Sequence, residues 1–248
     1  MKILGIIPAR YASTRFPAKP LADIAGKTMI NRVYDQANLA ACLTELVVAT
    51  DHQKIFDHVI SFGGKAVMTS ESHQSGTDRA CEAMKKMSDE YDFAINIQGD
   101  EPFIDPGQVE LLAECFAEDH CELATLVKKI EHQEELSDPN QVRVVLTTNS
   151  EAIYFSRATI PYQRGTAPEQ WLDNHTYYKH VGIYGYRTDI LRKVSKLKPS
   201  SLETAECLEQ LRWIENGLRI KTRVTDHDAI CIDTPEDLQR ALAQLQAD

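Results

Sequence analysis

Short apolar runs alternate with segments of helical period through the first 110 residues, and no other feature constrains the fold as strongly. The runs with strand character are Lys2–Ile7, Leu46–Ala49, Ala66–Met68 and Phe93–Ile97. The segments between them place apolar side chains on one helical face: Met29, Ile30, Val33 and Ala37; Ile55, Val59 and Phe62; Ala80, Ala83, Met84 and Met87. This order predicts βαβ units and an α/β fold with a mostly parallel sheet flanked by helices. Because ligands bind beyond the carboxyl ends of such strands, the residues that follow them are the functional candidates.

The pattern loosens between about residues 151 and 192, where prolines, glycines and tyrosine-rich runs occur. We expect one domain over residues 1–248, with a smaller, partly antiparallel lobe or dimerisation flap at about 151–192. Farther along, Leu202–Asn216 predicts a helix closed by Gly217, and Ile220–Val224 predicts a strand. Thr234 has the character of an N-cap for a last helix that starts at Pro235.

The charge balance is acidic, with 37 Asp and Glu against 27 Lys and Arg and a formal net charge of −10. This argues against a general nucleic-acid binder, which needs clustered cations. No stretch approaches the roughly 18–20 apolar residues of a membrane helix, and the first apolar run is interrupted by Pro8 and Arg10, unlike a signal peptide. We therefore expect a cytoplasmic protein without membrane insertion. Against this background, the first twenty residues hold four basic side chains and no acidic one.

The cysteines show no pattern typical of a metal site or a disulfide framework. No CxxC motif and no His-Cys spacing of the zinc-finger kind occurs. We interpret them as reduced, mostly buried thiols that act as small hydrophobic residues. They are Cys42, Cys81, Cys115, Cys121, Cys207 and Cys231.

A basic loop follows the first predicted strand. Arg10, Arg15 and Lys19 lie in it, with hydroxyl groups nearby and no acidic residue before Asp23. A triphosphate needs several cations to offset its charge, and Arg supplies a bidentate fork where Lys supplies a point charge. The loop is not a Walker A sequence. It is either a polyanion site or a solvated basic loop.

Two further motifs lie at the ends of predicted elements: one follows a strand and the other begins a helix. Asp100 comes after a buried strand and after Gly99, where it is well placed to hold Mg²⁺ through a carboxylate; the alternative is a cap or turn residue. The segment Ser75–Arg79 begins a helix and could present backbone N–H groups to a base or phosphate. An equally good local interpretation makes Thr77 a plain N-cap.

Taken together, the motifs closely resemble the 3-deoxy-manno-octulosonate (Kdo) cytidylyltransferase family, also called CMP-Kdo synthetases. The similarity extends from residue 3 to about 240. The related sialate cytidylyltransferases share the Pro-Ala-Arg opening but continue with a loop of Gly-Gly-Ser-Lys type. The matching runs, in family order, are IIPARYASTRFPAKPL, SGTDR, NIQGDEP, YFSRATIPY, HVGIYGYR, LEQLRWIENG and IDTPEDL.

The resemblance implies a fold of the nucleotide-diphospho-sugar transferase type and a Mg²⁺-dependent transfer. The anomeric hydroxyl of Kdo would attack the α-phosphate of CTP, giving CMP-Kdo and pyrophosphate for the inner core of lipopolysaccharide. The enzyme would be a homodimer whose partners are CTP and an acidic 2-keto-3-deoxy sugar.

The resemblance also implies roles for individual residues. The triphosphate would be held by Arg10, Arg15 and Lys19. Cytosine and the rest of the nucleotide would contact Pro8, Ala9, Ser75, Gly76, Thr77 and Gln98. Mg²⁺ would be bound by Asp100 and Asp233. The sugar would contact Arg164, His180, Tyr184, Glu209 and Gln210, with Arg164 as the partner of its carboxylate.

Several alternatives stay open at this level. The segments Ser201–Glu206 and Thr222–Cys231 differ from the enterobacterial form, so the sugar could be 8-amino-Kdo, or sialate in a more distant reading. A non-catalytic nucleotide-sugar binding protein is the alternative from another class. No dedicated base is visible, although His180 could serve as one. Ala18 stands where many family members have Gly, so a positive φ there would be strained.

Overall fold

The computed structural model describes residues 1–12, 16–118, 120–228 and 230–247, with the side chains of 244–247 excepted. The chain forms two compact units. The first unit comprises Met1–Glu110, Gly185–Ser195 and Ala229–Asp248, and the second comprises Leu111–Tyr184 and Lys196–Asp228. The expectation of one domain with a lobe at about 151–192 stays a prediction.

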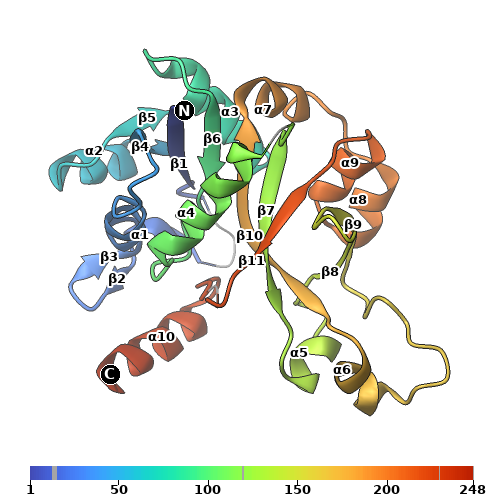
Figure 1. The fold of residues 1–248 in the computed structure, drawn as a ribbon. Coiled ribbons are helices and arrows are strands. Elements are labelled where there is room, and N and C mark those ends of the chain that lie inside the picture. Colours follow the sequence, from blue (N-terminus) through green and yellow to red (C-terminus); the bar gives the residue numbers. More distant parts are fainter. Residues whose placement is uncertain (13–15, 119, 229, 248) are drawn as a thin grey trace. The chain divides into compact units, whose positions relative to one another are not determined.

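The first unit is built on a parallel sheet. The strands lie in the order β6 (Phe93–Asn96), β1 (Ile3–Ala9), β4 (Glu45–Thr50) and β5 (Ala66–Met68), each parallel to its neighbour. The central strand β1 is almost wholly buried, as expected where helices cover both faces of a parallel sheet. Its carboxyl end and that of β6 therefore open onto the same edge (Figure 1).

The helices of this unit follow the predicted apolar faces. They are α1 (Met29–Ala37), α2 (Gln53–Ser61), α3 (Gly76–Lys86), most of α4 (Pro106–Glu114) and α7 (Thr188–Val194). Met29, Ile30, Val33 and Ala37 are all fully buried on α1, whose N-cap Thr28 accepts a hydrogen bond from the N–H of Asn31. The mostly parallel α/β fold predicted from the alternation is confirmed.

The C-terminal helix α10 (Pro235–Ala247) belongs to the first unit and completes a small core. Besides residues of α10, this core includes Ile24 of β2 (Asp23–Ile24) and Met29 of α1. Strand β2 follows the short η1 (Lys19–Leu21) and pairs with β3 (Lys27–Thr28), and Figure 1 shows α10 beneath the β2–β3 hairpin. The buried members of the core are Ile24, Met29, Ile232 and Ala241. Thr234 Oγ1 accepts from the N–H of Asp237, which confirms the predicted N-cap. Residues near both ends of the chain are thereby packed together.

The second unit combines parallel and antiparallel pairing. Strands β7 (Leu123–Lys129) and β11 (Lys221–Val224) are parallel, whereas β8 (Arg143–Leu146) is antiparallel to both β9 (Ala152–Ser156) and β10 (Tyr178–Arg187). Strand β10 continues into the first unit from residue 185. The helical elements are η2 (Cys115–Ala117), α5 (Gln133–Ser137), η3 (Pro168–Gln170), α6 (Trp171–Asn174), α8 (Ser201–Glu206) and α9 (Gln210–Glu215).

A buried arginine organises the loops of the second unit. Arg143, on β8, is 1% exposed, and its guanidinium donates to several backbone carbonyl groups. Hydrogen bonds from a charged donor stabilise a fold by about 1.5–3 kcal/mol each, so this one side chain ties several backbone segments together. The acceptors are the carbonyls of Glu135, Leu136, Asp138, Gln141 and Arg157.

Two expectations about local structure are wrong. The predicted helix over 202–216 is two helices, α8 and α9, because Cys207 adopts a left-handed conformation with φ 54° that ends α8. Gly217 does adopt a positive φ after α9, as predicted. The cysteines are unpaired as expected, but only Cys81 and Cys115 are buried; Cys207 and Cys231 are exposed.

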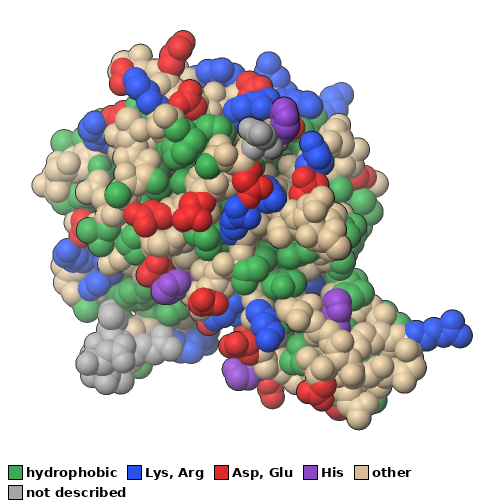
Figure 2. Space-filling view, viewed as in Figure 1, with side chains coloured by type: hydrophobic (Ala, Val, Ile, Leu, Met, Phe, Trp, Pro, Cys, Tyr) green, Lys and Arg blue, Asp and Glu red, His purple; other side chains and the backbone are tan. Residues whose placement is uncertain are grey.

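No helix among the described residues is both long and apolar enough to cross a membrane. On the face drawn in Figure 2, acidic and basic side chains of the described residues are interspersed rather than gathered into one basic field. On this face, the described residues therefore form no extended basic surface of the kind that a nucleic-acid backbone requires.

Candidate functional site

A cavity of about 380 Å³ lies in the first unit, at the carboxyl ends of β1 and β6 and at the start of α3. Most of the residues predicted to bind a nucleotide line it, among them Arg10 and Gln98. Ala9 ends β1 and Thr77 is buried in α3, both next to lining residues. Arg15 lies outside the described residues. The lining residues are Pro8, Arg10, Lys19, His73, Gln74, Ser75, Gly76, Arg79, Gln98, Gly99, Asp100 and Asp233.

Lys19 joins two carboxylates on one side of this cavity. Its Nζ lies 2.8 Å from Asp100 Oδ2 and 3.0 Å from Asp233 Oδ1. Burial alone would lower the pKa of Lys19, but the charges and hydrogen bonds of the two carboxylates outweigh it and raise the pKa above its ordinary value. The lysine is therefore a fixed cation between two anions.

Asp100, Asp233 and Cys231 together form a cluster that fits a divalent cation. One ligand atom from each lies within 4.8 Å of the others. The backbone holds the two halves together, since the N–H of Ile232 donates to the carbonyl of Asp100 at 2.9 Å. Paired carboxylate oxygens are the donors that Mg²⁺ prefers, and the ammonium between them shows that a cation is accommodated there.

Glu101, next to this cluster, is a buried acid. It is 4% exposed, and its Oε2 has no hydrogen-bond partner among the described residues. Burial, and secondarily the charge of Asp100, raise the pKa of Glu101 to about 8. The carboxyl group is therefore mainly protonated at neutral pH.

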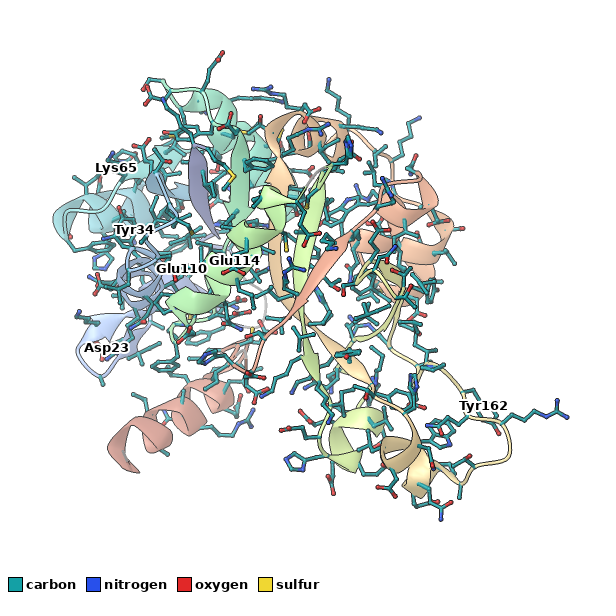
Figure 3. The ribbon with its side chains drawn as sticks, viewed as in Figure 1. Asp23, Tyr34, Lys65, Glu110, Glu114 and Tyr162 are labelled. Carbon is teal, nitrogen blue, oxygen red and sulfur yellow. The ribbon has the colours of Figure 1, made fainter. Side chains whose placement is uncertain are left out.

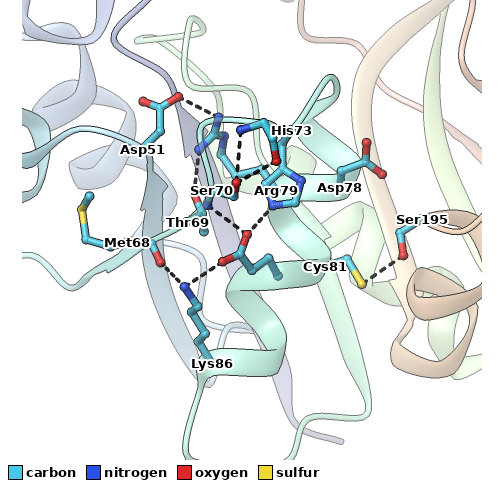
Figure 4. Close-up of polar contacts among 12 residues, drawn as sticks. Asp51, Met68, Thr69, Ser70, His73, Asp78, Arg79, Cys81, Lys86 and Ser195 are labelled. Carbon is cyan, nitrogen blue, oxygen red and sulfur yellow. Dashed lines mark hydrogen bonds and ion pairs between the residues drawn. The ribbon is translucent and has the colours of Figure 1, made fainter.

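A second ion pair fixes the start of the basic loop (Figure 4). Arg79 Nη2 donates to Asp51 Oδ2 at 2.8 Å and its Nη1 donates to Thr69 Oγ1 at 2.6 Å, with the arginine 3% exposed. The other oxygen of Asp51 accepts from the N–H of Tyr11 at 3.2 Å. The ring of Tyr11 also stacks on His52, with centroids 3.9 Å apart. Helix α3 thus sets the position of the backbone just after Arg10.

The turn before α3 is held by Glu82 (Figure 4). This carboxylate accepts from the N–H of Ser70, contacts His73 Nε2 and pairs with Lys86 at 2.7 Å. Burial acts in the opposite direction, but these hydrogen bonds lower the pKa of Glu82 to about 2. His73, which lines the cavity, is thereby fixed to the helix.

The N-cap of α3 is Ser75 rather than Thr77. Ser75 Oγ accepts from the N–H of Asp78 at 3.1 Å, and Thr77 is buried in the first turn. The local interpretation that made Thr77 the cap is wrong, because the helix begins at Gly76. The first N–H groups of an 11-residue helix therefore lie at the cavity wall, where an anion is favoured.

Two backbone positions beside the cavity have conformational requirements: Gly99 lies very close to another loop, and Ala18 has a positive φ. A Cβ on Gly99 would lie 2.5 Å from the carbonyl oxygen of Pro8, so only glycine fits between the ends of β1 and β6. Ala18 adopts φ 56°, the left-handed conformation that the comparison with glycine at this position anticipates. Such a conformation costs an alanine roughly 1–2 kcal/mol.

The residues predicted to contact the sugar lie in the second unit. His180 Nε2 is 2.9 Å from Thr125 Oγ1, and the His180 ring lies 5.1 Å from that of Tyr184. Tyr184 in turn packs edge-on against Trp213 of α9, the helix whose start is formed by Glu209 and Gln210. The structure brings these four predicted residues to β10 and α9.

Two properties of this set bear on its chemistry. Burial lowers the pKa of His180 to about 3, so its imidazole is neutral at neutral pH. Arg164 is exposed on the loop between β9 and η3.

Comparison with known proteins decides the family. Residues 4–220 match the family model described as cytidylyltransferase. The chain is 53% identical to the 3-deoxy-manno-octulosonate cytidylyltransferase of Parabacteroides distasonis, over 99% of this chain and 98% of that one. It is 56% identical to the enzyme of that name from Cytophaga hutchinsonii, over 97% and 96%. The chain belongs to the 3-deoxy-manno-octulosonate cytidylyltransferase family.

A solved structure agrees with this membership. A CMP:2-keto-3-deoxy-manno-octonic acid synthetase complexed with CTP is 44% identical, with a TM-score of 0.93 over 100% of this chain and 99% of that one. The predicted nucleotidyltransferase fold and enzyme class are confirmed. The roles given to individual residues stay predictions.

Sequence reasoning missed four residues that line the cavity or contact its lining residues. Asp51 follows strand β4 directly, so the rule that selected Asp100 would have selected it too. Arg79 and Glu82 lie on α3, and their partners, such as Asp51 and Ser70, lie in other segments of the chain. Cys231 was interpreted as a buried hydrophobic residue, yet it lies exposed beside two carboxylates.

We expect Gly99→Ala to destabilise the first unit. The new Cβ would force apart the ends of β1 and β6, which should cost about 1–3 kcal/mol as other overpacked sites do. Gly76→Ala is the matched control, because its Cβ would meet only ordinary contacts from 3.5 Å outward. Urea unfolding without nucleotide, followed by circular dichroism, measures both. Equal changes in the two variants would contradict this account.

We also expect His180 to make the second unit less stable in acid. The unfolded histidine binds a proton below about pH 6.5 and the folded one does so only near pH 3. Unfolding free energy should therefore fall as pH drops below 6.5, by up to about 2 kcal/mol at pH 5. His180→Gln should remove this contribution, and the exposed His175→Gln should not. Tryptophan fluorescence in urea at pH 7 and 5 reports it, since Trp171 and Trp213 both lie in this unit; identical pH dependence in all three proteins would refute it.

Proposed function

We propose that this chain transfers the cytidylyl group of CTP to 3-deoxy-manno-octulosonate and releases pyrophosphate. The observation that carries the proposal is the cavity of the first unit, where a cationic loop, a helix N-terminus and two carboxylates converge. Whole-chain similarity to a synthetase complexed with CTP supports the identity of the nucleotide, and the names of the curated relatives support that of the sugar. The product would be an activated sugar for the inner core of lipopolysaccharide, made in the cytoplasm.

Cationic groups and backbone donors would hold the triphosphate. Arg10 is exposed at the cavity and Lys19 lies within it, so both reach a polyanion. The N–H groups at the start of α3 add positive potential without a formal charge. We propose the same role for Arg15. These groups would stabilise the negative charge that develops on the phosphoryl oxygens and on the departing pyrophosphate.

The carboxylates of Asp100 and Asp233 would hold Mg²⁺. Bound there, the ion would neutralise phosphate oxygens and lower the pKa of a coordinated hydroxyl. Lys19, whose ammonium pairs with both carboxylates here, would then be available to pair with phosphate. Asp100 and Asp233 would then be neutralised by the metal ion, and Lys19 by the phosphate.

The sugar would contact Arg164, His180, Tyr184, Glu209 and Gln210. The exposed guanidinium of Arg164 suits the sugar carboxylate as a bidentate partner. A neutral imidazole with a pKa near 3 is a poor base but a good hydrogen-bonding group, so we assign His180 to binding. This leaves the proton of the attacking hydroxyl to be lost without a dedicated side-chain base.

The proposal is tested by measuring pyrophosphate release from CTP and magnesium with a panel of sugars. Kdo should support turnover, and 8-amino-Kdo and sialate should support much less. A preference for 8-amino-Kdo or sialate would identify a different sugar substrate for the same cytidylyl transfer. Nucleotide binding with no turnover on any sugar would favour a non-catalytic binding protein.

We expect Asp100→Asn to lower kcat at least about 100-fold, because the substitution removes a charge that holds the metal. Asp35→Asn is the matched control: its partner Lys27 is on the surface, and its turnover should stay within about twofold. Steady-state pyrophosphate release gives both values. A kcat for Asp100→Asn near that of the control would contradict the assigned role.

We further propose a homodimer. The second unit exposes apolar and aromatic side chains, with Ile153 50% exposed and Tyr162 74% exposed; Figure 3 shows Tyr162 on the loop between β9 and α6. Burial of such side chains against a second copy would be favourable. Light scattering should give about 56 kDa, twice the 28.0 kDa of one chain. A mass near 28.0 kDa at micromolar concentration would refute the dimer.

A further inference from the structure

The cation cluster contains a thiol that the proposed chemistry does not use. Cys231 Sγ lies within 4.8 Å of a carboxylate oxygen of both Asp100 and Asp233, and the residue is exposed. Two oxygen donors alone suit a hard cation such as Mg²⁺. A sulfur donor beside them changes the preference, because thiolates select Zn²⁺ and other soft or borderline ions.

The surroundings also favour a dication. The carboxylates of Asp100 and Asp233 meet here, and Lys19 is the cation between them. Glu101, next to Asp100 in the chain, is 4% exposed and its Oε2 lacks a partner among the described residues. A tightly bound dication would offset the two carboxylates of Asp100 and Asp233 more fully than one ammonium does.

The geometry allows the thiol to coordinate. Donor atoms around a tetrahedral Zn²⁺ with bonds of about 2.0–2.3 Å are separated by about 3.3–3.8 Å. The observed limit of 4.8 Å leaves about 1 Å to be closed, which side-chain rotation can supply. Coordination forms a metal–sulfur bond and releases the thiol proton to solvent, with no change in oxidation state.

We propose that Cys231 is a third ligand that gives this site a high affinity for thiophilic divalent ions, with Zn²⁺ and Cd²⁺ as the class. Such an ion would take the place assigned to Mg²⁺ and inhibit turnover. This inference rests on the proposed function for the location of the Mg²⁺ site, and it assigns a role in metal selectivity to the cysteine of the Cys-Ile-Asp-Thr segment.

The test uses the full chain, reduced and without nucleotide, titrated with Cd²⁺ alone. Wild type should develop the ultraviolet thiolate-to-Cd²⁺ charge-transfer band with one ion bound. Cys231→Ser should lose that band and bind Cd²⁺ at least tenfold more weakly, a difference of about 1.4 kcal/mol. Cys207→Ser, which removes the other exposed thiol, should behave as wild type. A band of equal strength in Cys231→Ser, or no band in wild type, would overturn the proposal.

A second measurement separates this inference from the proposed function. In the pyrophosphate assay with saturating Mg²⁺, micromolar Zn²⁺ should inhibit wild type and Cys207→Ser, and the inhibition constant should rise at least tenfold in Cys231→Ser. If the Cd²⁺ band depends on Cys231 but the chain transfers no cytidylyl group, the proposed function is refuted and the assignment of Cys231 as a metal ligand stands. Mg²⁺-dependent transfer with no such band would refute the ligand alone.

Discussion

The ion pairs of Lys19 with Asp100 and Asp233 are the interaction on which the site depends. The three residues come from the start, the middle and the end of the chain, and none of them lies in a β-strand. Two carboxylates whose oxygens approach within 4.8 Å repel each other unless a cation lies between them. The lysine supplies that cation, and the hydrogen bond from Ile232 to the carbonyl of Asp100 keeps the C-terminal segment in register with it.

Two further contacts support the same arrangement from either side. The Arg79–Asp51 pair fixes the loop at Tyr11, before Lys19, through a backbone hydrogen bond. The small core that includes Ile232 and Ala241 holds α10, after Asp233. Neither contact touches a proposed reacting atom. Both determine where the charged groups stand, which is the property that electrostatic catalysis requires.

The sequence predicted most of the sheet and most of the residues that line the cavity, because both follow from local patterns. Buried parallel strands have apolar runs, and functional side chains follow such strands, which is how Asp100 was found. Contacts between residues that are far apart in the sequence have no local pattern by which they could be predicted. Arg143 is 1% exposed and would be expected at the surface from its charge. The break at Cys207 was missed because a non-glycine residue gives little warning of a left-handed conformation.

Ala18 shows how the ion pairs and the backbone constrain one another. A left-handed alanine is disfavoured by roughly 1–2 kcal/mol, and a glycine would adopt the same φ without that cost. The conformation is nevertheless held from both sides: the N–H of Ala18 donates to the carbonyl of Tyr11, and Lys19 is bound to two carboxylates. Because glycine loses more conformational entropy on folding, alanine also limits the freedom of the unfolded loop. The strain is therefore offset in part by the unfolded state and in part by the ion pairs that hold Lys19 at the cavity.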